Sequence, residues 1–117
     1  MQSYRKLQVW QKSHQIVLNV YRLTLAFPND ERFGLTSQIR RCAVSIPSNI
    51  AEGSARGSDA DYARFLHIAL GSVTELDYQL LLANDLAFIK NDEYEIIARE
   101  IDEIGKMLNG FIKRLKQ

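Results

Sequence analysis

Apolar residues recur every three or four positions along almost the whole chain, which is the period of an amphipathic α-helix. Short segments rich in Pro, Asn, Asp, Gly and Ser separate four such stretches. The pattern predicts helices over roughly residues 7–27, from 31–35 to 55, 59–88 and from 91 to the C-terminus, and no strand pattern competes strongly. Short connections between long helices favour antiparallel neighbours. We therefore predict an all-α, antiparallel up-down-up-down four-helix bundle, with residues 1–117 forming one domain.

Each predicted helix carries one apolar stripe that is expected to face the core. In the first helix the stripe is Trp10, His14, Val17, Tyr21 and Leu25. The stripes of the other helices are Leu35, Ile39, Cys42, Ala43, Ile46 and Ile50; then Tyr62, Phe65, Leu66, Ala69, Val73, Leu76, Leu80 and Ala83; and finally Ile97, Ile101, Ile104, Leu108, Phe111 and Leu115. Further apolar residues lie off these stripes, at Leu18, Ile68, Leu70, Ile96 and Ile112.

The most unusual segment is Ser45–Gly53, which places Pro47 inside the helical pattern of the second helix. Proline lacks an N–H group and its ring crowds the carbonyl four residues earlier, at a cost of about 3 kcal/mol in a helix interior. The second helix is therefore predicted to be kinked at Pro47, or to restart there, and not to give way to a long loop. Ser45, Asn49 and Glu52 belong to a polar stripe beside this break, which begins with Gln38 and Arg41.

Helix ends are predicted from capping residues. Ser58 followed three residues later by Asp61 resembles a capping box for the third helix. Asn91 or Asp92 is expected to cap the fourth helix, with Glu95 completing the box for Asp92.

Two further interactions are expected. Gly71 and Ser72 interrupt the long third helix, and close approach of another helix would explain a glycine there. Glu52 is expected to pair with an arginine such as Arg41.

A search for catalytic or metal-binding groups finds none. A di-iron site needs Glu-x-x-His pairs, but the residues three positions before His14 and His67 are Gln11 and Arg64. His14 is expected to be a hydrogen-bonded core or interface residue, and the lone Cys42 a small core residue. We predict a protein that is not an enzyme and that uses no metal or cofactor.

The net charge of +1 conceals an asymmetry, because residues 1–60 carry eight Lys/Arg against four Asp/Glu and residues 61–117 carry seven against ten. The asymmetry is compatible with complementarity within one fold or between subunits, or with a basic face for nucleic acid. An antiparallel bundle would bring the basic residues of the two termini together. The candidate phosphate-contacting residues are Arg5, Lys6, Lys12, Arg40, Arg41, Arg56, Lys113, Arg114 and Lys116.

Several motifs in order resemble the four-helix-bundle proteins encoded within intervening sequences of bacterial 23S rRNA genes. They are segments 7–12, 21–28, 33–41, 45–53 and 69–76. The segment that includes Ser45, Pro47, Asn49, Glu52 and Gly53 is the strongest. The resemblance implies a cytoplasmic, non-enzymatic homopentamer. It also implies a relation to an accessory protein of diversity-generating retroelements, a basic pentameric barrel that works with a reverse transcriptase and RNA.

The sequence and the resemblance together predict an oligomeric accessory protein that binds RNA or DNA through its basic clusters. The alternative is a scaffold module that binds only protein. The off-stripe apolar residues add weight to a homo-oligomer, and the resemblance favours a pentamer. No apolar run is long enough to cross a membrane, and the first seven residues lack the apolar stretch of a secretion signal, so the protein is expected in the cytoplasm.

Overall fold

The computed structural model describes residues 3–117. Met1 and Gln2 lie outside the described part, although they begin both the predicted domain and the segment inspected for a secretion signal. Within residues 3–117 the chain forms helices and no strand. In order they are the 3₁₀ turn η1 (Tyr4–Lys6), α1 (Gln8–Thr24), the 3₁₀ turn η2 (Asn29–Glu31), α2 (Leu35–Ser54), α3 (Asp59–Asp85) and α4 (Asn91–Leu115). The all-α four-helix fold predicted from the apolar period is confirmed.

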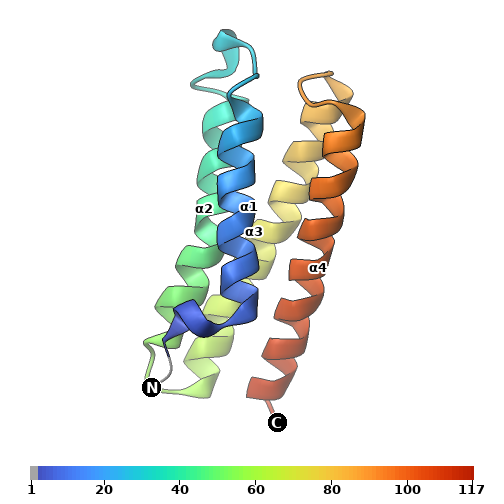
Figure 1. The fold of residues 1–117 in the computed structure, drawn as a ribbon. Coiled ribbons are helices and arrows are strands. Elements are labelled where there is room, and N and C mark those ends of the chain that lie inside the picture. The colour runs from blue at the N-terminus through green and yellow to red at the C-terminus, as the bar shows by residue number, and fades with distance from the viewer. Residues whose placement is uncertain (1–2) are drawn as a thin grey trace.

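The four long helices form an elongated bundle that measures 44 × 24 × 20 Å. In Figure 1 the chain runs up α1, down α2, up α3 and down α4, so both ends of the chain lie at the lower end of the bundle. Contacts join α1 to α2, α2 to α3, α3 to α4 and α4 to α1, and the α2–α3 pair has the most extensive contact.

The core is one cluster of buried side chains from all four helices. The stripes predicted for α2 and α3 are buried except for Tyr62, which is half-buried against the core. In α4 the first four stripe residues are buried, but Ile112 replaces Phe111 and Leu115 as the last fully buried position. The expectation that Ile112 lies off the stripe was therefore wrong, because the spacing of four after Leu108 keeps it on the core side.

The stripe predicted for α1 was also wrong, by one position. The buried residues are Val9, Ser13, Ile16, Val20, Leu23 and Thr24, of which the first five have spacings of four and three. A serine interrupts this stripe in the sequence. Its hydroxyl donates a hydrogen bond to the carbonyl of Val9 at 2.7 Å, which allows the polar group to be buried.

The predicted stripe instead forms an outer surface of α1, called here the outer α1 stripe: Trp10, His14, Val17, Tyr21 and Leu25. Trp10 and Val17 are half-buried, whereas His14, Tyr21 and Leu25 are exposed. The His14 ring stacks on Trp10 with centroids 5.1 Å apart. Because His14 is exposed it is not a core residue, and its place at an interface stays a prediction. Leu18 next to this stripe is 49% exposed.

Pro47 lies inside α2, which continues through it from Leu35 to Ser54. The prediction that Pro47 occupies a helix instead of a loop is confirmed, and a kink at this position stays a prediction. The side chain of Asn49 donates a hydrogen bond to the carbonyl of Ser45 at 2.7 Å, so polar side chains bond to the backbone around the proline.

Two glycines differ in a way that the sequence did not reveal. A Cβ added to Gly53 would lie 2.8 Å from Cβ of Phe65 and 2.9 Å from Cδ1 of Tyr62, so Gly53 is where α2 and α3 approach closely. A Cβ added to Gly71 would meet no described atom within 4 Å. No other helix of this chain therefore approaches Gly71 closely, and approach by a helix from elsewhere stays a prediction, although Ser72 does contact α2.

The helix ends follow the capping rules only in part. The hydroxyl of Ser58 accepts a hydrogen bond from the Asp61 N–H at 3.1 Å, which confirms the cap predicted for α3. The caps predicted for α4 were wrong, because the N-cap is Lys90 and no side chain caps it. Asn91 is already the first helical residue, and the Asp92 carboxylate accepts from the neighbouring Glu93 N–H instead.

The third helix ends at Asp85, three residues before the predicted end. Ala87 has a φ of 63°, the left-handed conformation that closes many helices. The Phe88 N–H then bonds to the Ala83 carbonyl at 2.9 Å, which turns the chain toward α4.

Candidate functional site

The turn η1 and the last turns of α4, which carry basic residues of the two ends of the chain, both lie at the lower end of the bundle in Figure 1. A groove of about 600 Å³ separates the start of α1 from the last turns of α4, and Arg114 is among its lining residues. We call the five cations of the two terminal segments the basic end: Arg5, Lys6, Lys113, Arg114 and Lys116. All five are exposed, and none forms an ion pair within residues 3–117. The structure thus places the two terminal clusters at the same end of the bundle, where η1 contacts α1 and α2.

The other candidate cations are not all part of this end. Lys12 forms an ion pair with Glu103 at 2.6 Å. Arg40 donates a hydrogen bond from Nε to the Thr24 hydroxyl at 2.8 Å, and its guanidinium lies 4.7 Å from the centre of the Tyr21 ring. These two side chains therefore serve contacts within the bundle.

The prediction that Glu52 pairs with an arginine is confirmed, but the residue named as an example, Arg41, is not the partner. Glu52 forms an ion pair with Arg56, one turn further along, at 2.9 Å. The nearer position along the helix explains the choice, because residues four apart share a helix face. Arg41 instead lines a groove between α2 and α3 and forms no ion pair within residues 3–117.

The groove between α2 and α3, called here the α2/α3 groove, has a volume of about 490 Å³ and a polar lining. Its residues are Gln38, Arg41, Cys42, Ser45, Glu75 and Gln79. Three residues of the polar stripe predicted for α2, Gln38, Arg41 and Ser45, thus line the groove beside α3. The hydroxyls of Ser45 and Ser72 lie 2.6 Å apart across it, and Ser45 donates to the Cys42 carbonyl at 2.7 Å.

Cys42 lies at the bottom of this groove and its thiol is held in the neutral form. The Sγ–H donates to the Ser72 carbonyl at 3.2 Å. Burial is the largest of the causes that together raise the pKa of the Cys42 thiol to about 12. Hydrogen bonding with the Glu75 side chain and the negative charge of that carboxylate act on this pKa in the same direction. Because the thiolate is the reactive species, Cys42 lacks the electrostatic setting of a nucleophile.

We expect native Cys42 to resist alkylation at pH 8 and to react once the chain is unfolded in urea. The measurement is the rate of iodoacetamide labelling followed by mass spectrometry, with Ser48→Cys, an exposed position on the same helix, as the reactive control. Because the folded-state pKa is the higher one, any stability from the protonated thiol should be lost as the pH rises from about 9 toward 12. Equal labelling rates at positions 42 and 48 would contradict the assignment.

Gln79 is the residue of this groove that the sequence analysis missed. Its side chain is only 7% exposed, and its Oε1 is the one buried side-chain oxygen or nitrogen in the described chain without a hydrogen-bond partner. The available signal was its position one turn after Glu75, which places both residues on one face of α3. Glu75 itself is exposed and forms no ion pair within residues 3–117.

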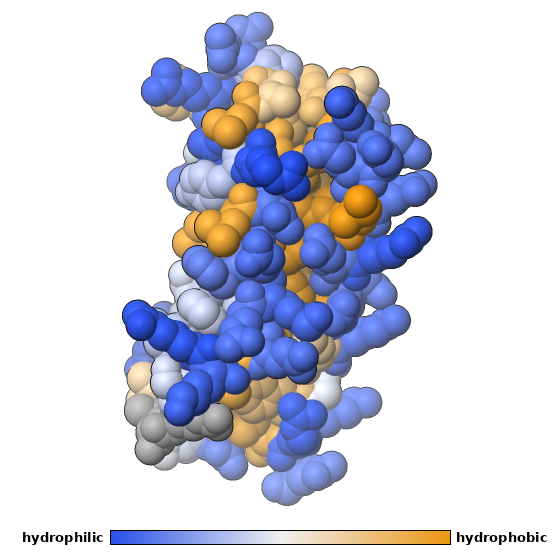
Figure 2. Space-filling view, in the orientation of Figure 1, coloured by the Kyte–Doolittle hydropathy of each residue, from blue (hydrophilic) through white to orange (hydrophobic). Residues whose placement is uncertain are grey.

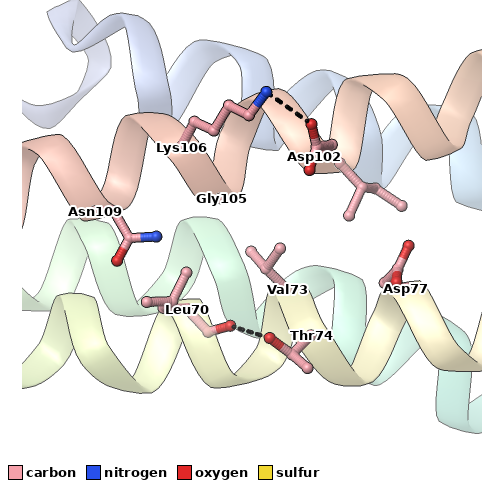
Figure 3. Close-up of a pocket in the computed structure, with 9 residues that line it drawn as sticks. Leu70, Val73, Thr74, Asp77, Asp102, Gly105, Lys106 and Asn109 are labelled. Atoms are coloured by element: carbon pink, nitrogen blue, oxygen red, sulfur yellow. Dashed lines mark hydrogen bonds and ion pairs between the residues drawn. The ribbon is translucent and has the colours of Figure 1, made fainter.

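A third groove, of about 260 Å³, lies between α3 and α4 and is drawn in Figure 3. Lys106 spans one turn of α4 to pair with Asp102 at 3.2 Å, and the Thr74 hydroxyl bonds to the Leu70 carbonyl at 3.3 Å. These two contacts lie within single helices, and Asp77 of α3 and Asn109 of α4 also line the groove.

Residues 3–117 contain no cluster of three or more His, Cys, Asp or Glu side chains that could hold a metal ion. In the same range, none of the helices combines the length and the apolar character that crossing a membrane requires. The features that stand out are the basic end, the outer α1 stripe and the α2/α3 groove.

These features define a helical-bundle protein with a basic end and an uncovered apolar helix surface. The chain belongs to the 23S rRNA-intervening sequence protein family, whose model matches residues 5–110. It is also similar to a crystal structure of a protein with unknown function from the S23 ribosomal protein family of Bacteroides thetaiotaomicron. The two are 33% identical, with a TM-score of 0.83 over 90% of this chain and 95% of that chain. No curated protein matches the chain.

Proposed function

We propose that this protein is a non-enzymatic cytoplasmic accessory protein that assembles as a homopentamer and binds RNA or DNA through its basic end. The observation that carries the proposal is the gathering of Arg5, Lys6, Lys113, Arg114 and Lys116 at one end of the bundle without acidic partners. Unpaired Lys and Arg side chains attract phosphates, and each phosphate that they neutralise releases counterions.

Assembly would multiply a patch that is small on one chain. The net charge is only +1, so one copy has no strong field over its whole surface. Several copies that point the same end in one direction would place their basic ends side by side. This arrangement needs an interface between copies, and the exposed apolar side chains seen as orange patches among the blue surface in Figure 2 support one.

The test is binding of a fluorescently labelled structured RNA and of a DNA duplex at two salt concentrations. We expect affinity to fall steeply with salt, because counterion release drives binding. The double variant Lys113→Glu/Lys116→Glu should bind more weakly and with a shallower salt slope, reduced by about one for each phosphate that is no longer neutralised. The matched control is Lys90→Glu/Arg99→Glu, which changes two exposed positions at and near the start of the same helix and should bind like the unmodified protein.

The second candidate function is a scaffold that binds only protein. Exposed apolar residues favour it, because Phe33, Leu25 and Ile96 are 89%, 79% and 60% exposed. An assembled protein that binds neither nucleic acid even at low salt would reject the first proposal and support the scaffold.

A further inference from the structure

We infer that the nucleic acid bound in the proposed function is RNA with unpaired bases, and that these bases stack on a row of aromatic rings along the outside of α1. This row, called here the aromatic track, consists of Tyr4, Trp10, His14 and Tyr21. It begins at η1, next to the basic end, and follows α1 away from it (Figure 1). The inference rests on the proposed function and adds the form of the nucleic acid and the side chains that contact its bases.

The first part of the track is a set of three rings in contact. The Tyr4 ring meets the Trp10 ring edge-on, with centroids 5.0 Å apart, and the His14 ring lies within 5° of parallel to Trp10. The Gln11 side-chain amide donates a hydrogen bond to the Arg5 carbonyl at 2.8 Å, which holds η1 against α1. Trp10 packs against the core whereas His14 is exposed, so the rings are both fixed in position and accessible.

The track continues to Tyr21, which lies two turns beyond His14 on the outer α1 stripe, with Val17 between them. Tyr21 is 44% exposed, and the guanidinium of Arg40 lies 4.7 Å from the centre of its ring. Bases stack on guanidinium planes as well as on aromatic rings, so Arg40 extends the surface that is open to stacking. From Trp10 to Tyr21 the helix rises about 16 Å, which is enough for several nucleotides.

Cations without acidic partners stand at both ends of the track. Arg5 and Lys6 lie at its start, where the Arg5 guanidinium is 5.9 Å from the centre of the Tyr4 ring. Arg40 lies at its far end and donates its Nε–H to a neutral hydroxyl. None of these three cations forms an ion pair within residues 3–117. The rings are therefore bracketed by positive charge that a phosphate backbone can neutralise.

The helices that carry the track contribute no negative charge of their own. Residues 8–24 of α1 and residues 35–51 of α2 contain no Asp or Glu. The two cations within α1, Lys12 and Arg22, already pair with carboxylates of α4, so they do not count toward the free charge. This side of the α1–α2 pair thus offers rings and cations to a ligand and no carboxylate to repel a phosphate.

This combination identifies a single strand as the occupant. A row of aromatic rings together with cations is how proteins bind single-stranded nucleic acid, because every base has a face that can stack and every nucleotide carries a phosphate. In a duplex the base faces are already stacked on each other, so the rings cannot reach them. An apolar protein surface would cover the rings but leave the cations at both ends unpaired. RNA is the nucleic acid that presents unpaired bases in loops, bulges and ends.

The experiment compares a short RNA without self-complementarity with the same RNA annealed to its complement. Trp10 is the only tryptophan of the chain, so its fluorescence reports directly on the track. We expect the single strand to bind at least about fivefold more tightly than the duplex, which corresponds to one stacked base. At equal saturation the single strand should also quench Trp10 fluorescence more strongly.

Two substitutions then remove single rings of the track. His14→Ala and Tyr21→Leu should each weaken single-strand binding about fivefold or more and leave duplex binding unchanged. Because Tyr21→Leu removes no charge, its salt slope should equal that of the unmodified protein. The matched controls are His67→Ala and Tyr78→Leu, which change an exposed histidine and an exposed tyrosine of α3 and should bind like the unmodified protein. Circular dichroism checks that each variant is folded, and the comparison of single strand with duplex needs no variant.

The outcomes separate this inference from the proposed function. Equal affinity for single strand and duplex, or folded track variants that bind the single strand like their controls, would overturn the inference. If both RNAs then still bind with a steep salt dependence, the proposed function stands. Track variants that change the mass in sedimentation velocity but not RNA binding would show a contact between copies instead, and would also overturn the inference. No binding of any nucleic acid at low salt would reject the proposed function and the inference together.

Discussion

Replacing Gly53 with alanine is expected to lower the free energy of unfolding by about 1–3 kcal/mol, the usual range for an overpacked core. The added Cβ would lie 2.8 Å from Cβ of Phe65, which is attached directly to the α3 backbone and cannot rotate away. The two helices would have to separate, and the α2–α3 contact is the most extensive one in the bundle. Urea unfolding followed by circular dichroism measures the change.

The control for this prediction is Gly57→Ala. Gly57 lies in the connection between α2 and α3, a Cβ there would meet no described atom within 4 Å, and its φ is not positive. Its replacement should therefore change stability by less than about 0.5 kcal/mol. If both alanine variants unfold at the same urea concentration, the close approach at Gly53 does not limit stability.

The second large effect is expected at Ile16, which is 1% exposed in the middle of α1. Ile16→Ala should lose about 2–5 kcal/mol, because the removed methyl groups leave a cavity among residues from the other helices. Leu25→Ala, at a position 79% exposed, should lose less than about 0.5 kcal/mol. Urea unfolding at several protein concentrations, extrapolated to low concentration, removes any contribution from contacts between copies.

This pair of variants tests which side of α1 faces the core. A larger loss at Leu25 than at Ile16 would mean that the apolar stripe predicted from the sequence is the buried one after all. The comparison also bears on nucleic-acid binding, since only an uncovered outer α1 stripe is available to stack on bases.

The sequence determined the four helices, because long amphipathic periods and clear breaks act locally and need no knowledge of distant residues. It also determined the core sides of α2 and α3, where one continuous stripe leaves no alternative. In α1 two neighbouring sets of positions both recur with the helical period. The set with the large side chains of Trp10 and Tyr21 looks more apolar in the sequence than the set that contains Ser13. Only the packing shows that a serine bonded to its own helix is buried, while a leucine nearby stays outside.

For the candidate site, too, the sequence predicted some features and could not predict others. The basic residues of the termini could be identified from the sequence. Their location at the same end of the bundle could be predicted too, because an even number of antiparallel helices returns the chain to the end where it started. The sequence could not show which cations already have partners, because these depend on neighbouring helices: Arg40 of α2, for example, bonds to Thr24 of α1. The sequence therefore determined the helices and the basic character of one end, through local periodicity and residue type. Tertiary structure alone decided the exposed side of α1, the open space at Gly71 and the unpaired oxygen of Gln79, because each depends on which side chains from other helices come near.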